Sequence, residues 1–97
     1  MASENREIIE AAATVIALRS PDGLHVSAPA NWREIDLQYD APAHLVVRLT
    51  PAGDNATAVE VFQREALLAA ETLRGYRSAD GLADLIEGVH RRAIERA

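Results

Sequence analysis

Two segments near the middle of the chain alternate strictly between apolar and polar residues, and this pattern limits the fold more than any other feature. The segments cover residues 33–39 and 44–50. A β-strand points successive side chains to opposite faces of its sheet, so the alternation predicts two strands that are each buried on one face. Too few residues separate them for a parallel crossover, and we expect them to pair antiparallel. The inward-facing residues would be Ile35, Leu37, Tyr39, Leu45, Val47 and Leu49.

The N-terminal segment predicts a short amphipathic helix over residues 4–13. Its apolar residues recur at spacings of three and four, which places them on one side of a helix. Ser3 precedes the first turn and can cap it, and acidic side chains in that turn suit the helix dipole.

The segment that follows fits two structures. Residues 14–19 are rich in β-branched side chains and precede the turn sequence Ser-Pro-Asp-Gly at 20–23. We therefore expect a hairpin in which they pair with residues 24–28. The alternative is a helix that continues to Arg19, because Ile16 extends the apolar stripe.

Residues 57–62 also fit two structures. Thr57 and Glu60 have the spacing of a helix capping box. The same residues alternate and follow a turn-rich loop, which favours a strand that pairs with residues 44–50. We prefer the strand, followed by a helix over residues 63–74 that ends at a glycine.

The C-terminal segment predicts another helix. Ser78 or Asp80 can cap its N-terminus. Its acidic residues come early and its arginines come late, which is the order that matches the helix dipole. The apolar stripe consists of Leu82, Leu85, Ile86, Val89 and Ala93.

Together these elements predict an α+β fold. A chain of 97 residues has room for one hydrophobic core, so we expect a single domain over residues 1–97. It would consist of a short N-terminal helix, an antiparallel meander of four to five strands, and two C-terminal helices packed on one face of the sheet.

Composition excludes several classes of function. The chain has no cysteine, which excludes disulfides, thiolate catalysis and thiolate metal centres. Its formal net charge of −5 gives weak attraction to nucleic acid or anionic lipid. No apolar run is long enough for a membrane span and the polar start does not resemble a signal peptide, so we expect a cytoplasmic protein. We expect neither a metal nor a cofactor, because the sequence has no metal-ligand spacing or phosphate-binding glycine loop.

The first candidate site is the outward side of the expected sheet. In the expected register His25, Asp36, His44 and Arg48 project on the same side, and we call this set the polar face. Imidazoles beside carboxylates can transfer protons or bind a metal. A solvated sheet face has the same polar alternation without any function, and this simpler interpretation is the more common one.

The second candidate site is the expected junction between the two C-terminal helices. Arg74, Tyr76, Arg77 and Ser78 lie there, and two guanidinium groups, a phenol and a helix N-terminus can bind a phosphate or carboxylate. The structural interpretation is that Gly75 ends one helix, Ser78 caps the next and the arginines are solvated.

For function we expect a non-enzymatic interaction or accessory module that forms a homodimer or binds another protein. It would use a sheet edge or an alanine-rich helix face, with Trp32 as a candidate interface residue. The alternative is a ligand-binding protein or enzyme that uses one of the two candidate sites. A third, less favoured, hypothesis is nucleic-acid binding through residues 90–92 and Arg96.

Overall fold

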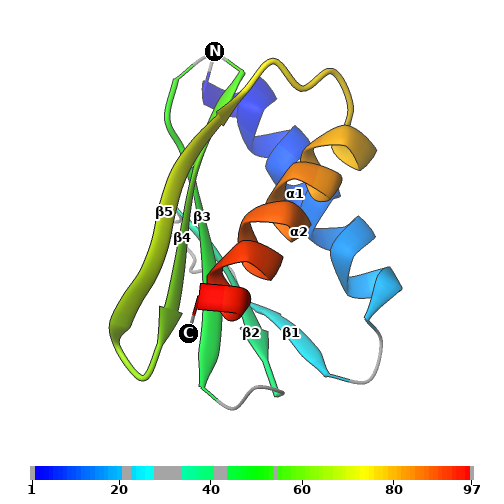
Figure 1. Cartoon of the computed structure of the whole chain (residues 1–97). Coiled ribbons are helices and arrows are strands. Elements are labelled where there is room, and N and C mark those ends of the chain that lie inside the picture. Colours follow the sequence, from blue (N-terminus) through cyan, green and yellow to red (C-terminus); the bar gives the residue numbers. More distant parts are fainter. Residues whose placement is uncertain (1, 21–22, 28–33, 41–43, 54, 97) are drawn as a thin grey trace.

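The computed structural model describes all residues except 1, 21–22, 28–33, 41–43, 54 and 97. Its elements are α1 (Ala2–Arg19), β1 (Leu24–Ser27), β2 (Ile35–Tyr39), β3 (Leu45–Pro51), β4 (Ala56–Gln63), β5 (Ala66–Arg74) and α2 (Ala79–Arg96). The strands form one antiparallel sheet in the order β1-β2-β3-β4-β5, so sequence neighbours lie side by side (Figure 1). The predicted α+β class and antiparallel meander are confirmed.

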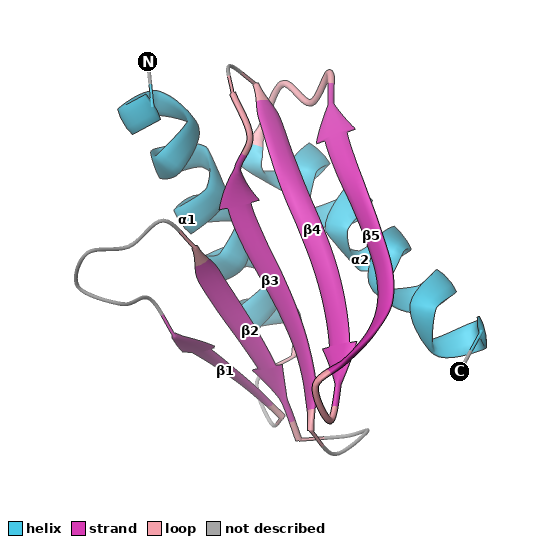
Figure 2. Ribbon diagram, turned by 90° about the vertical axis from the view of Figure 1, so that its left-hand side faces the viewer, coloured by secondary structure: helices cyan, strands magenta, loops and turns pink. Residues whose placement is uncertain are grey.

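Both helices cover the same face of the sheet, and no described element covers the other face, which we call the open face (Figure 2). α1 packs against β1, β2 and β3, whereas α2 packs against β4 and β5. The two helices also contact each other, and Arg19 at the end of α1 forms ion pairs with Asp84 and Glu87 of α2. Neither helix, over the residues that the structure describes, has the length and apolar character needed to cross a membrane.

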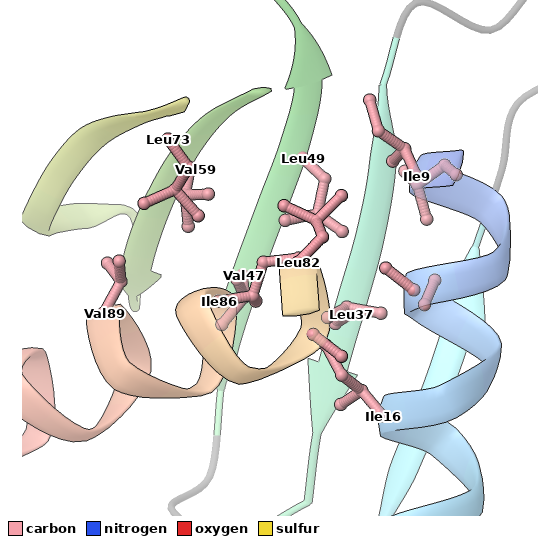
Figure 3. Packing of buried hydrophobic residues seen from close by; sticks show 14 of the residues in the cluster. Ile9, Ile16, Leu37, Val47, Leu49, Val59, Leu73, Leu82, Ile86 and Val89 are labelled. Atoms are coloured by element: carbon pink, nitrogen blue, oxygen red, sulfur yellow. The ribbon is translucent and has the colours of Figure 1, made fainter. Parts of the chain in front are cut away.

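The hydrophobic core lies between the helices and the covered face of the sheet (Figure 3). In β2 and β3 buried residues alternate with less buried ones, as the sequence pattern predicts. Burying these side chains removes apolar surface from water, which is the main force that holds the helices on the sheet. Fully buried residues include Ile9, Ile16, Leu37, Val47, Leu49, Val59, Leu82, Ile86 and Val89.

The first correction concerns residues 14–19, which are helical. The predicted hairpin with residues 24–28 is wrong, because α1 continues to Arg19 and β1 pairs with β2 instead. Ile16 is only 1% exposed and lies on the same buried side of α1 as Ile9. Burial of Ile16 in the core stabilises the helix. This gain is larger than the modest cost of placing β-branched residues in a helix.

The second correction concerns the segment after β4. The strand predicted over residues 57–62 is confirmed, but residues 66–74 form β5, so the chain has one C-terminal helix and not two. The chain reverses at Arg64 and Glu65, whose φ angles are 51° and 70°. Positive φ at both central positions is typical of a type I′ hairpin turn. Hydrogen bonds to β4 pair the backbone groups on one side of this segment, and this pairing overrides the helix propensity of its alanines and leucines.

β5 is irregular near its start. The register with β4 shifts between Val61 and Phe62: Ala69 lies opposite Val61, and Leu67 lies opposite Phe62. Leu68 is the extra residue of this β-bulge, and it packs against the core together with Ala69. Beyond the bulge, pairing with β4 is regular to the end of β5.

Candidate functional site

The open face of the sheet contains a concavity of about 800 Å³ beside the turn that joins β4 to β5. All four residues of the polar face line it, although they come from separate segments of the sequence. Antiparallel register brings them together, because His25 lies opposite Gln38 and Asp36 lies opposite Arg48. The structure thus gathers the first set of candidate residues, and their function stays a prediction.

Arg48 makes the firmest polar contacts in the concavity. Its Nε donates a hydrogen bond to Oδ1 of Asp36 at 2.9 Å, and its Nη2 donates to Oδ2 at 3.3 Å. The carboxylate of Glu34 is 3.7 Å from the same Nε, and the guanidinium lies 5.4 Å from the centroid of the Phe62 ring. The hydrogen bond that Arg48 donates to Asp36 is the main reason why the pKa of Arg48 is raised. Arg48 and Asp36 therefore largely neutralise each other.

The two histidines of the polar face come from different places in the sheet, since His25 lies in β1 and His44 directly precedes β3. Nε2 of His25 is 3.6 Å from Oδ2 of Asp40, an ion pair only when the imidazole is protonated. His44 has a left-handed φ of 65°, and its carbonyl accepts a hydrogen bond from the amide of Arg64 at 3.3 Å. This bond fixes the residue before β3 to the turn after β4. In the described part of the chain, no three His, Asp or Glu residues are placed to hold a metal ion.

Residues 74–78, the second candidate site, connect β5 to α2. Tyr76 is only 6% exposed, and its hydroxyl lies 2.9 Å from Oγ1 of the buried Thr57. Oγ of Ser78 accepts a hydrogen bond from the amide of Gly81 at 3.0 Å, so it caps α2. The phenol and the hydroxyl thus have structural contacts, and the two exposed arginines are what this segment offers to an anion. Binding of an anion by this segment stays a prediction.

Sequence reasoning missed a half-buried aromatic pair on the covered face. The ring of Tyr39 stacks on His90 of α2, with centroids 4.4 Å apart and an interplanar angle of 30°. Burial lowers the pKa of His90, whose Nε2 is buried without a hydrogen-bond partner among the described residues. Burial and the charge of Glu87 raise the pKa of Tyr39 to about 12. The alternation in β2 indicated that Tyr39 points inward, but no local signal paired it with His90.

The remaining predicted interface residue, Trp32, lies outside the described residues. Comparison of the chain with family models, curated proteins and solved structures finds no match. The structure therefore defines the class by architecture: a small α+β protein whose five-stranded antiparallel meander has two helices on one face.

Proposed function

We propose that this chain is a non-enzymatic interaction module that acts as a homodimer in the cytoplasm. The observation that carries the proposal is the long edge of the sheet at β5. This strand has nine residues, and within the described chain it pairs only with β4. Most of its residues are exposed. An edge strand presents a row of N–H and C=O groups that can pair with another strand.

The chemistry of the concavity supports a non-enzymatic role. Arg48 and Asp36 bind each other, which leaves neither group free to act on a substrate without breaking their contact.

The test of the homodimer is the absolute mass of the purified chain, measured by light scattering across a dilution series. We expect twice the mass of one chain at high concentration and a fall towards one chain on dilution. The mass of a single chain at every concentration would contradict the proposal.

A second candidate function is binding of a small aromatic anion in the concavity. Its lining combines the apolar side chains of Val46 and Phe62 with Arg64, whose guanidinium has no carboxylate within ion-pair distance among the described residues. Benzoate is a suitable probe in an NMR titration of the labelled chain. We expect saturable shifts at these three residues that weaken in Arg64→Gln, and shifts that do not saturate would exclude this function.

A further inference from the structure

We infer that the homodimer forms by antiparallel pairing of β5 with β5 of a second copy, which joins the two sheets into one. This inference rests on the proposed function, because it names the surface through which the same homodimer assembles. A twofold axis makes such a contact self-complementary, since each strand offers its partner the same donors and acceptors that it receives.

The two edges of the sheet differ in their protection against pairing. β1 has four residues, and Pro21 and Pro29 flank it in the sequence; short length and proline are both devices that block edge pairing. β5 has nine residues and no proline or lysine, and its two charges, Glu71 and Arg74, have opposite signs. Two copies with a net charge of −5 repel each other, and this neutral strand is a surface where the repulsion is weak.

The bulge limits the register of the proposed contact. Side chains alternate regularly only from Ala69 onward, and residues opposite each other in a sheet must share a face. If the twofold axis passed between the two copies of Ala70, the regular part of one strand would lie opposite the bulge of the other. If the axis passed between the two copies of Glu71, two carboxylates would lie opposite each other. An axis through Thr72 avoids both problems. It places Thr72 opposite its own copy and Arg74 opposite the partner's Ala70.

The side of α2 that faces β5 also supports a second copy of the chain as the partner at this edge. Leu85, Val89 and Arg92 follow one another at spacings of four and three, so they lie on one side of the helix. Nη2 of Arg92 donates a hydrogen bond to Oε2 of Glu71 at 2.9 Å, which shows that this side faces β5. Leu85 is nevertheless 41% exposed. α2 lies on the covered face beside β5 (Figure 2). A twofold axis normal to the sheet would keep both α2 helices on this face, so the leucine would lie towards the partner's helix across the joined edge.

A single introduced cysteine tests the contact, because the chain contains none of its own. In Thr72→Cys the two thiols would meet at the axis, where opposite Cα atoms of an antiparallel pair are about 4.5–5.5 Å apart, within disulfide range. We expect mild oxidation to give a covalent dimer on a non-reducing gel. Leu18→Cys is the matched control, since Leu18 of α1 is 76% exposed and lies outside the sheet, and we expect it to stay a single chain.

Two charge variants test the register. Ala70→Lys places a lysine opposite the partner's Arg74, so we expect the mass of one chain at concentrations where the unmodified chain is dimeric. Ala70→Gln places an uncharged side chain at the same position and is expected to keep the dimer; a carboxylate is avoided there because Ala70 also lies opposite Glu60 of β4. Equal dimer stability in these two variants would overturn the Thr72 register.

The outcomes separate the inference from the proposed function. If the unmodified chain has the mass of a dimer but Thr72→Cys cross-links no faster than Leu18→Cys, the β5 contact is wrong and the homodimer stands. If the unmodified chain has the mass of a monomer at every concentration, the proposed function fails and the inference fails with it.

Discussion

Three buried or half-buried polar side chains, Thr57, Tyr76 and His90, show how individual residues adapt to this core. All three positions are shielded from water, and removing a polar atom from water costs free energy that an apolar side chain would not incur. Thr57 and Tyr76 share a hydrogen bond between β4 and the segment that leads into α2. His90 uses its ring to stack on Tyr39. These contacts join the C-terminal segment to the sheet.

The hydroxyl contact between Thr57 and Tyr76 is expected to contribute to stability. Tyr76→Phe removes the phenol and leaves the buried hydroxyl of Thr57 without this partner, so we expect the free energy of unfolding to fall by about 1–3 kcal/mol. Urea denaturation measures the change. The control is the double variant Tyr76→Phe with Thr57→Val. We expect its free energy of unfolding to be higher than that of Tyr76→Phe alone, because neither of the two hydroxyls remains. Strictly additive losses would show that the two groups do not interact.

The half-buried His90 is expected to make stability depend on pH. Burial lowers its pKa in the folded chain, and in the unfolded chain the pKa returns to about 6.5. The unfolded state therefore binds the proton more tightly. Above about pH 6.5 the neutral imidazole makes its full contribution to the free energy of unfolding. That contribution is lost as pH falls below about 6.5 towards the folded-state pKa.

His90→Phe tests this dependence, because it keeps a ring against Tyr39 and removes the titrating group. We expect the free energy of unfolding to fall less steeply in the variant than in the unmodified chain as pH decreases below about 6.5. Urea denaturation at several pH values gives both slopes. Equal slopes would mean that His90 does not titrate differently in the folded and unfolded chains.

Among the elements, the hairpin of β4 and β5 depends on a turn of unusual composition. Arg64 and Glu65 both have positive φ, which costs a residue with a Cβ roughly 1–2 kcal/mol. Type I′ turns favour Asn-Gly at these two positions. The chain accepts the cost because the long pairing of β4 with β5 determines where it must reverse.

Replacing this turn is expected to stabilise the protein. For Arg64→Asn combined with Glu65→Gly, we expect the free energy of unfolding to rise by about 1 kcal/mol, since the strain at both positions is relieved. Thermal unfolding followed by circular dichroism measures the effect. The matched control is Glu65→Val, which puts a β-branched side chain at the same φ and should lower the unfolding temperature. An unfolding temperature that falls in the Asn-Gly variant would contradict the assigned turn.

Local sequence patterns predicted some of these elements correctly and others not. Alternation identified β2 and β3, because one buried face requires that period. Ser78 signalled the start of α2. Residues 66–74 gave no such signal, because alanine and leucine favour a helix and the turn before them lacks asparagine and glycine. Residues 14–19 suit a strand locally, yet Ile16 fits the buried stripe of α1.

At the scale of the whole molecule, the helices protect one face of the sheet and leave the other face and the β5 edge exposed. The polar face converges on the open face because β1, β2 and β3 pair in this register and His44 directly precedes β3. The sequence suggested that these residues share a side, and their arrangement around one concavity required the actual pairing. The same order of strands places β5 at an edge of the sheet, and the homodimer proposal therefore names this strand as the contact.

A homodimer through this edge should unfold at a higher temperature as protein concentration rises. Association stabilises only the folded chains, so mass action favours them at high concentration. We expect the unfolding midpoint of the unmodified chain to increase across a dilution series followed by calorimetry. The midpoint of Ala70→Lys should be independent of concentration. A constant midpoint in the unmodified chain would argue against a homodimer.

The sequence by itself determined the α+β class and the inward-facing residues of β2 and β3; it favoured the strand over residues 57–62 and offered Ser78 as one of two caps for α2. These features depend on side-chain periodicity and on contacts within a few residues. Only the tertiary structure decided that residues 14–19 are helical, that residues 66–74 form an edge strand, and that Tyr39 stacks on His90. Their local patterns fit more than one structure, and burial in a shared core and pairing with a distant strand supply the energy that selects one.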